Sequence, residues 1–121
     1  MMKSSNFRDL IVWQKAMDLT IEIYALVKHL PKDETYALSE QMRRAVVSIP
    51  SNIAEGQGRD SIKEFTRFLS VARGSLRELS TQLDICKRVR FLTSSQTSNA
   101  ETMITEIDKM LFSLSNSLIP F

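Results

Sequence analysis

Residues 61–88 read SIKEFTRFLSVARGSLRELSTQLDICKR, and this stretch decides the fold of the chain. Its apolar residues recur at alternating spacings of four and three from end to end, at Phe65, Leu69, Ala72, Leu76, Leu79, Leu83 and Cys86. Such a seam lies on one side of a helix and packs against other helices at a shallow crossing. Ser61 and Glu64 form a capping box, so the helix is expected to begin directly after Ser61.

The segment before Pro31 shows the same helical periodicity. Its expected inward residues are Leu10, Trp13, Met17, Thr20, Tyr24 and Val27, and Ala16, Ile23 and Leu30 widen this stripe. A last helix is expected after residues 91–95, with residues 98–101 as a second capping box. Its inward residues are Met103 or Ile104, Ile107, Met110 or Leu111, Leu114 and Leu118.

Another helix is expected from about Glu34 to Gln57, and Gly56 and Gly58 should end it in a left-handed cap. Its inward residues are Leu38, Met42, Ala45, Val46, Ile49 and Ile53. Pro50 lies inside this pattern and lacks an N–H, so it predicts a kink. The sequence therefore predicts an all-α fold, an antiparallel up-and-down four-helix bundle whose second helix is kinked at Pro50.

The composition supports one helical domain, expected to span residues 1–121. Three glycines and three prolines supply little turn material for an all-β fold. No stretch approaches the ~20 apolar residues of a membrane span, and the N-terminus does not resemble a signal peptide. We therefore expect a cytoplasmic protein with no membrane partner.

Residues suited to catalysis are scarce. The chain has one histidine, His29, and one cysteine, Cys86, and these counts exclude the usual cysteine- and histidine-rich metal sites. His29 stands at a predicted helix end without a nucleophile framed for it, and Cys86 belongs to the apolar seam. The sequence therefore predicts no enzyme, no metal, no cofactor and no small-molecule substrate.

Positive charge gathers in the middle of the chain. Residues 43–90 hold ten basic and five acidic residues, although the whole chain has a net charge of only +2. Basic side chains of this kind bind the phosphates of nucleic acids. The candidate nucleic-acid-binding residues are Arg59, Lys63, Arg67, Arg73, Arg77 and Arg88.

Two like-charge pairs at a spacing of four, Lys63 with Arg67 and Arg73 with Arg77, need compensation by negative charge. Phosphates would supply it, and so would carboxylates of a neighbouring helix or subunit. An ordinary solvated face with mixed charges is a third interpretation.

Two further groups of residues are candidates for structural roles. Gly74 costs about 1 kcal/mol relative to alanine inside a helix, so with Ser70 it is a candidate oligomer interface. A polar network is expected to include Arg44, Asn52, Glu55 and Glu78, with Arg44 or Arg59 paired to Glu55 or Glu78.

Five runs of the sequence resemble the bacterial proteins encoded in intervening sequences of 23S ribosomal RNA genes. They are FRDLxxWQKA at residues 7–16, LP at 30–31, QMRRA at 41–45, SIPSNIAEG at 48–56 and ARGSLxEL at 72–79. The resemblance implies a four-helix bundle that assembles as a homo-oligomer, typically a pentameric ring, without enzymatic activity. That family is also similar to the accessory variability protein of diversity-generating retroelements, whose basic surface works with a reverse transcriptase and nucleic acid.

Two functions follow as expectations. One is a non-enzymatic oligomer that binds RNA, DNA or a nucleoprotein partner through its basic surface. The other is a structural or protein-interaction homo-oligomer, in which the same arginines pair with carboxylates across subunit boundaries.

Overall fold

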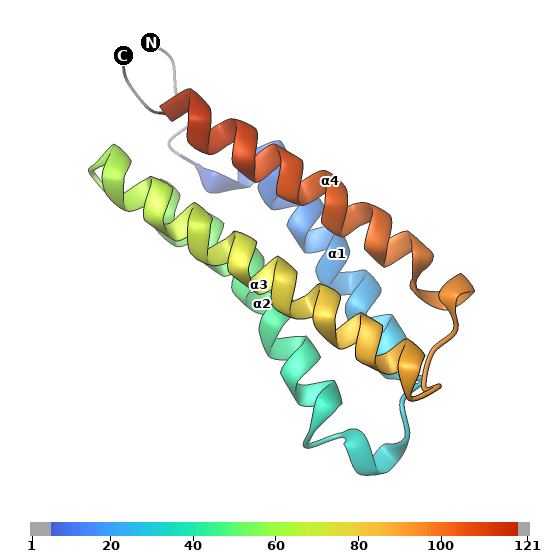
Figure 1. Cartoon of the computed structure of the whole chain (residues 1–121). Coiled ribbons are helices and arrows are strands. Elements are labelled where there is room, and N and C mark those ends of the chain that lie inside the picture. Colours follow the sequence, from blue (N-terminus) through green and yellow to red (C-terminus); the bar gives the residue numbers. More distant parts are fainter. Residues whose placement is uncertain (1–5, 119–121) are drawn as a thin grey trace.

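A computed structural model describes residues 6–118, in which four α-helices form an antiparallel bundle (Figure 1). The elements are η1 (Phe7–Asp9), α1 (Ile11–Val27), η2 (Lys32–Glu34), α2 (Leu38–Gln57), α3 (Ile62–Arg88) and α4 (Ser94–Leu118). Both α1 and α3 pack against α2 and against α4, and within the described residues the backbones of α1 and α3 stay apart, at diagonal corners of the bundle. The predicted all-α four-helix fold is confirmed. The domain range 1–121 stays a prediction, and its ends at 1–5 and 119–121 lie outside the described residues.

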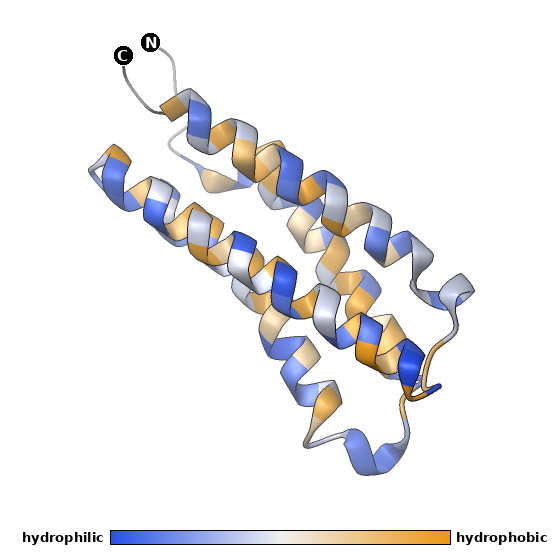
Figure 2. Cartoon of the chain, viewed as in Figure 1, coloured by the Kyte–Doolittle hydropathy of each residue, from blue (hydrophilic) through white to orange (hydrophobic). Residues whose placement is uncertain are grey.

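The apolar seam of α3 forms the centre of the core. Six of its seven residues, from Leu69 to Cys86, are at most 1% exposed, and Phe65 is partly buried against them. Figure 2 shows hydrophilic residues on the outward sides of the helices between hydrophobic ones that turn inward. Ser61 Oγ accepts a hydrogen bond from the Glu64 amide at 3.0 Å, as predicted. The Glu64 carboxylate instead accepts from Arg67, so the capping box is formed on one side only.

The inward face of α1 differs from the predicted one. Met17 and Tyr24 are 39% and 43% exposed, and the core is reached by Val12, Ala16, Leu19, Ile23 and Leu26. Because α1 carries apolar residues on two sides, the spacing alone admits either stripe. The prediction that Met17 and Tyr24 face inward was wrong.

The start of α2 also differs from the prediction. Residues 32–34 form a separate 3-10 turn, and the backbone of Ala37 is not helical (φ −125°, ψ −105°), so α2 begins at Leu38. The inward residues of α2 are as predicted, with Leu38 partly buried. The helix continues through Pro50, which is buried; the kink itself stays a prediction.

The glycines at the end of α2 act differently from the predicted left-handed cap. Gly58 caps α2 with φ −81°, and neither it nor Gly56 has a positive φ. Gly56 is buried where α2 meets α3, and a Cβ built on it would lie 2.7 Å from Cβ of Phe68. The glycine at position 56 therefore permits close packing of the two helices.

The start of α4 differs from the predicted one, because the capping box lies earlier in the chain. Thr93 Oγ1 accepts from the Gln96 amide at 3.1 Å, and Gln96 Oε1 accepts from the Thr93 amide at 2.8 Å. This reciprocal box starts the helix at Ser94, one turn before the predicted box at residues 98–101. Ile104, Ile107 and Leu111 are the buried choices among the predicted inward residues of α4.

Candidate nucleic-acid interface

Three of the six candidate cations are paired within the bundle. Arg59 bonds to Glu55 and Arg67 to Glu64, each within one helical turn. The guanidinium carbons of Arg59 and Arg67 also lie 5.0 and 4.5 Å from the ring centroid of Phe68. Arg59 therefore ties the turn between α2 and α3 to Phe68, Arg67 makes its contacts within α3, and the charge of both is largely balanced.

Arg73 joins α3 to α4. Its Nε lies 2.9 Å from Asp108 Oδ1 and its Nη2 lies 3.4 Å from Asp108 Oδ2, and its guanidinium lies 5.1 Å from the Phe112 centroid. The hydrogen bond to Asp108 raises the pKa of the Arg73 guanidinium. A carboxylate of a neighbouring helix in the same chain thus compensates the Arg73–Arg77 repulsion, which is one of the predicted alternatives.

The other three candidates, Lys63, Arg77 and Arg88, are exposed and make no ion pair with any residue between 6 and 118. They lie along the outward side of α3, over about 37 Å at the helical rise of ~1.5 Å per residue. Their charge is available to an external anion. The sequence had marked all six cations equally, because the acidic partners of Arg59, Arg67 and Arg73 depend on side-chain placement.

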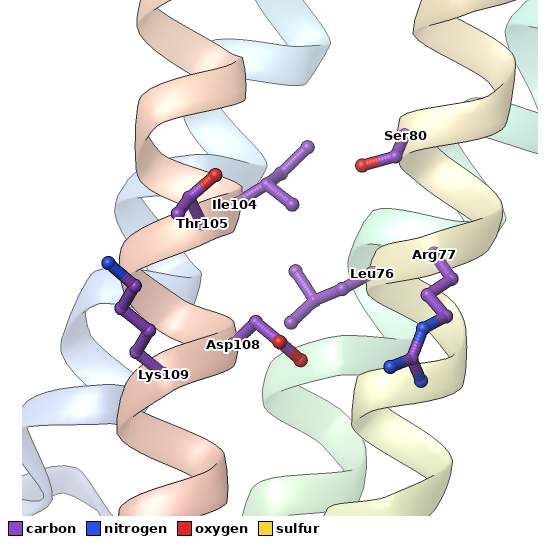
Figure 3. Close-up of a pocket in the computed structure, with 7 residues that line it drawn as sticks. All are labelled: Leu76, Arg77, Ser80, Ile104, Thr105, Asp108 and Lys109. Atoms are coloured by element: carbon purple, nitrogen blue, oxygen red, sulfur yellow. The ribbon is translucent and has the colours of Figure 1, made fainter.

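A shallow groove runs between α3 and α4 beside Arg77. It has a volume of about 240 Å³ and is lined by Leu76, Arg77, Ser80, Ile104, Thr105, Asp108 and Lys109. Figure 3 shows Leu76, Ile104 and Asp108 pointing into the space between the helices, with Arg77 on α3 and Lys109 on the outer side of α4. The hydroxyls of Ser80 and Thr105 add hydrogen-bonding groups. Lys109 makes no ion pair within the described part of the chain.

Lys109 was missed by the sequence prediction. It stands 32 positions after Arg77, in a helix with no charge run of its own. Only the packing of α4 against α3 brings both cations to one groove.

The turn from α3 to α4 adds another cation. The Phe91 amide donates to the Cys86 carbonyl at 2.8 Å and the Arg90 amide donates to the Lys87 carbonyl at 3.2 Å, which is the Schellman pattern of a helix end. Arg90 has φ 68°, a left-handed conformation that usually falls to glycine. Arg88 and Arg90 are both exposed here, so this end of α3 is basic.

Lys87, in contrast, is committed to the fold. Its Nζ bonds to Glu101 of α4 and lies 3.7 Å from Asp84, and the hydrogen bond to Glu101 raises the pKa of Lys87. Lys87 therefore holds α3 against α4, and the cations at this end of α3 without an ion pair within residues 6–118 are Arg88 and Arg90.

The predicted polar network forms only in part. The expected pairing of Arg44 or Arg59 with Glu55 or Glu78 is met by Arg59 and Glu55, whereas Arg44 pairs with Glu40 at 2.8 Å. An acid one turn earlier on α2 was the nearer partner. Asn52 Nδ2 donates to the Ser48 carbonyl at 2.7 Å. Glu78 is exposed and makes no ion pair within residues 6–118.

The small residues on α3 lie on its surface. Ser70 and Gly74 are both exposed, and a Cβ on Gly74 would meet no atom within 4 Å. Their part in an oligomer interface stays a prediction. Sequence reasoning missed a contact between the hydroxyls of Ser48 on α2 and Ser75 on α3, which are hydrogen-bonded to each other.

Residues suited to catalysis are not gathered anywhere in the described chain. His29 is exposed beyond the end of α1, and Cys86 is completely buried, where burial raises the pKa of its thiol. Residues 6–118 hold no group of three or more histidine, cysteine or carboxylate side chains placed to share a metal ion. None of their helices is long and apolar enough to cross a membrane.

Comparison with known proteins places this bundle in context. The family model described as 23S rRNA-intervening sequence protein matches residues 8–113. A solved structure from Bacteroides thetaiotaomicron, described as a protein with unknown function from the S23 ribosomal protein family, is 25% identical with a TM-score of 0.78. The match covers 87% of this chain and 98% of that one. No curated protein matches.

Proposed function

Because the chain belongs to the 23S rRNA intervening sequence protein family, we propose that it is a non-enzymatic, oligomeric helical-bundle protein of the cytoplasm that binds nucleic acid, alone or in a nucleoprotein, through the basic surface of α3 and α4. Neither the family nor the Bacteroides protein is a known enzyme. By the family resemblance, the oligomer is a homo-pentamer.

The nucleic-acid proposal rests on the exposed cations that have no acidic partner in the described part of the chain. Lys63, Arg77, Arg88, Arg90 and Lys109 are exposed cations that make no ion pair within residues 6–118, and all lie on α3, on α4 or in the turn that joins them. The acidic partners of Arg59, Arg67, Arg73 and Lys87 balance those neighbouring cations, so these five give the surface of α3, α4 and their turn its excess of positive charge. Contacts from such cations to phosphates are largely independent of base sequence and weaken as salt rises.

The groove beside Arg77 suits a phosphate. Arg77 and Lys109 stand on its two helices, and the Ser80 hydroxyl can donate to a phosphate, whereas the Thr105 hydroxyl donates to the Glu101 carbonyl at 3.1 Å and the Asp108 carboxylate is paired with Arg73. A guanidinium has five N–H donors, enough for a phosphate and one further acceptor. Phosphate bound at the groove would order the Arg77 side chain.

The test measures binding of short RNA and DNA oligonucleotides at several salt concentrations by fluorescence anisotropy. Arg77→Glu, Arg88→Glu and Lys109→Glu are each expected to weaken binding about tenfold, which corresponds to about 1.4 kcal/mol. Each should also lower the slope of log affinity against log salt by about 1.

Lys32→Glu provides the matched control. It makes the same change of charge at an exposed lysine of η2, which belongs to neither α3 nor α4, and should leave affinity nearly unchanged. Absence of binding at low salt, or equal losses for Lys32→Glu and Arg77→Glu, would contradict the nucleic-acid proposal.

A structural homo-oligomer without a nucleic-acid role is the second candidate function. The exposed apolar side chains on the outward sides of α1 and α3 favour it. In that case the wild type would self-associate and yet bind neither RNA nor DNA at low salt.

A further inference from the structure

Exposed apolar residues are concentrated on two helices. In residues 6–118, the large hydrophobic side chains that are exposed on α1 are Ile11, Met17, Ile21 and Tyr24, and those on α3 and its C-cap are Ile62, Val71, Ile85 and Val89. The described parts of α2 and α4 expose one each, Val47 and Phe112, and Tyr36 is exposed in the segment before α2. A concentration of this kind on a small domain marks a surface that is covered by a partner.

On each of the two helices, exposed residues at spacings of three or four form one stripe. The α1 outer stripe is Gln14, Met17, Ile21, Tyr24 and Lys28, and the α3 outer stripe is Val71, Gly74, Glu78, Thr81, Ile85 and Val89. The α1 stripe carries bulky side chains at its centre, and Ile21 is 69% exposed. Between its apolar residues the α3 stripe has Gly74, Glu78 and Thr81, and Gly74 has open space beside it.

Each stripe has a charged flank. The α1 flank has two acids beside Lys15, and the α3 flank has Arg73, Arg77 and Arg88 with one acid, Asp84, which lies 3.7 Å from Lys87, so the net charges of the two flanks are opposite in sign. Asp18 and Glu22 follow Lys15 by three and seven residues, so they share its side of α1, and Lys15 pairs with Glu106 of α4. Arg77 follows Arg73 by four residues on the side of α3 that bonds to α4, and Arg88 lies three turns further along that side. None of Asp18, Glu22, Arg77 and Arg88 has an ion pair within residues 6–118.

The two charged flanks also lie at similar levels along the axis of the bundle. Along α4, Glu106 lies between Asp108, the partner of Arg73, and Glu101, the partner of Lys87. Lys15 therefore stands at about the level of Arg77, since α1 and α3 run in the same direction. At the ~1.5 Å rise of a helix, Asp18 then lies within about one turn of the level of Arg77, and Glu22 within about one turn of that of Arg88.

We propose that the α1 outer stripe of one copy packs against the α3 outer stripe of the next copy of this chain, with the acidic flank of α1 beside the basic flank of α3. Both charged flanks lie on the α4 side of their stripes, so copies standing side by side in the same direction bring opposite charges together. The contact buries Ile21 against Thr81 and Ile85. It rests on the self-association included in the proposed function and names the surfaces that carry it.

The position of the two stripes decides the kind of assembly. Because α1 and α3 occupy diagonal corners of the bundle, their outward faces point in opposite directions. A contact between them is therefore head to tail, and each copy added leaves one stripe of each kind free until a ring closes. Arg77 lies at the edge of the contact, and its five donors allow it to bind both a carboxylate and a phosphate.

The first test measures mass by light scattering. The wild type should exceed the 13.8 kDa of one chain, and Ile21→Glu should have that mass. Phe112→Glu, which places the same charge at a similarly exposed apolar site on α4, should remain as large as the wild type. Far-UV circular dichroism verifies that all three are folded. A monomeric wild type, or equal masses for the two variants, would overturn the proposal.

A mixing experiment tests the head-to-tail geometry. Ile21→Glu loses the α1 stripe and Ile85→Glu loses the α3 stripe, so each alone should be monomeric. Mixed in equal amounts, they should form pairs of twice the monomer mass, since one intact stripe of each kind remains. A mixture that stays monomeric would rule out the α1-to-α3 contact.

Charge exchange separates this contact from nucleic-acid binding. Asp18→Lys with Glu22→Lys should weaken self-association about tenfold or more, and adding Arg77→Glu with Arg88→Glu should restore it. The same four changes should leave RNA binding weakened, because the free arginines are gone. Restored association without RNA binding supports the contact whatever becomes of the nucleic-acid proposal, and failure to restore association contradicts the contact alone.

Discussion

At the scale of single residues, Gly56 shows why the chain keeps a glycine inside a helix. Its missing side chain lets α2 lie against Phe65 and Phe68 of α3, where an added Cβ would meet Cβ of Phe68 at 2.7 Å and Cδ1 of Phe65 at 3.0 Å. Cβ of Phe68 is close to the backbone and cannot swing aside. The two helices would have to move apart to admit even a methyl group.

Gly56→Ala is therefore expected to lower the free energy of unfolding by about 1–3 kcal/mol, the usual effect of overpacking. Gly74→Ala is the matched control, because its methyl group meets nothing within 4 Å. It should raise stability by about 0.5–1 kcal/mol through helix propensity. Urea denaturation in the Ile21→Glu background measures both without a contribution from association. Equal effects at the two sites would contradict the close-packing role of Gly56.

The charged residues show the limit of prediction from the sequence. The basic character of the central region was readable, since it needs only a count along the chain. Which cations are free was not readable, because Arg73 meets Asp108 across 35 positions and Lys109 reaches the groove only through the packing of α4. For Arg44 the acid taken is local, since Glu40 lies one turn before it on the same helix.

At the scale of elements, α4 is held to α3 by two ion pairs and by packing. Arg73–Asp108 is the better shielded pair, with 25% and 34% of the two side chains exposed and two hydrogen bonds formed. Lys87–Glu101 lies two turns of α4 away, nearer the turn between the helices. Together they set the register of α4 on α3.

Asp108→Asn should lower the free energy of unfolding by about 0.5–1 kcal/mol, the upper range for a partly exposed pair. Glu106→Gln removes the partner of Lys15, where 39% and 52% of the side chains are exposed, and should change stability by less than about 0.3 kcal/mol. Thermal denaturation at low salt compares them, and high salt should shrink the difference. A larger loss for Glu106→Gln would show that the Arg73 pair does not hold α4.

The sequence predicted the four helices, but it predicted their buried faces and their first residues less well. The seam of α3 keeps one side apolar over many turns, so its inward face could be predicted correctly. The face of α1 could not, because apolar residues on two sides satisfy the same spacing. The start of α4 was misplaced because two adjacent segments both have the composition of a capping box, and only Thr93 and Gln96 make the bonds.

At the scale of the whole molecule, one buried cluster receives residues from all four helices. The only tryptophan, Trp13, lies in α1 and packs on this cluster, with its ring 5.3 Å from that of Phe7. Helices that share a core in this way should unfold together.

Urea unfolding of Ile21→Glu, followed by Trp13 fluorescence and by far-UV circular dichroism, should therefore give coincident transitions. Fluorescence reports on α1, whereas circular dichroism averages over all the helices. A fluorescence transition at clearly lower urea would show that α1 detaches first and would contradict a single cooperative unit.

The left-handed conformation of Arg90, just after α3, bears on why an arginine stands at this position. Arg90 occupies a conformation that costs an L-residue with a side chain about 1–2 kcal/mol and that glycine adopts freely. Stability alone would favour glycine at this position, yet the chain has a cation there, beside Arg88. The chain thus forgoes stability where two exposed arginines stand close together, as proteins do where a side chain serves a purpose other than folding.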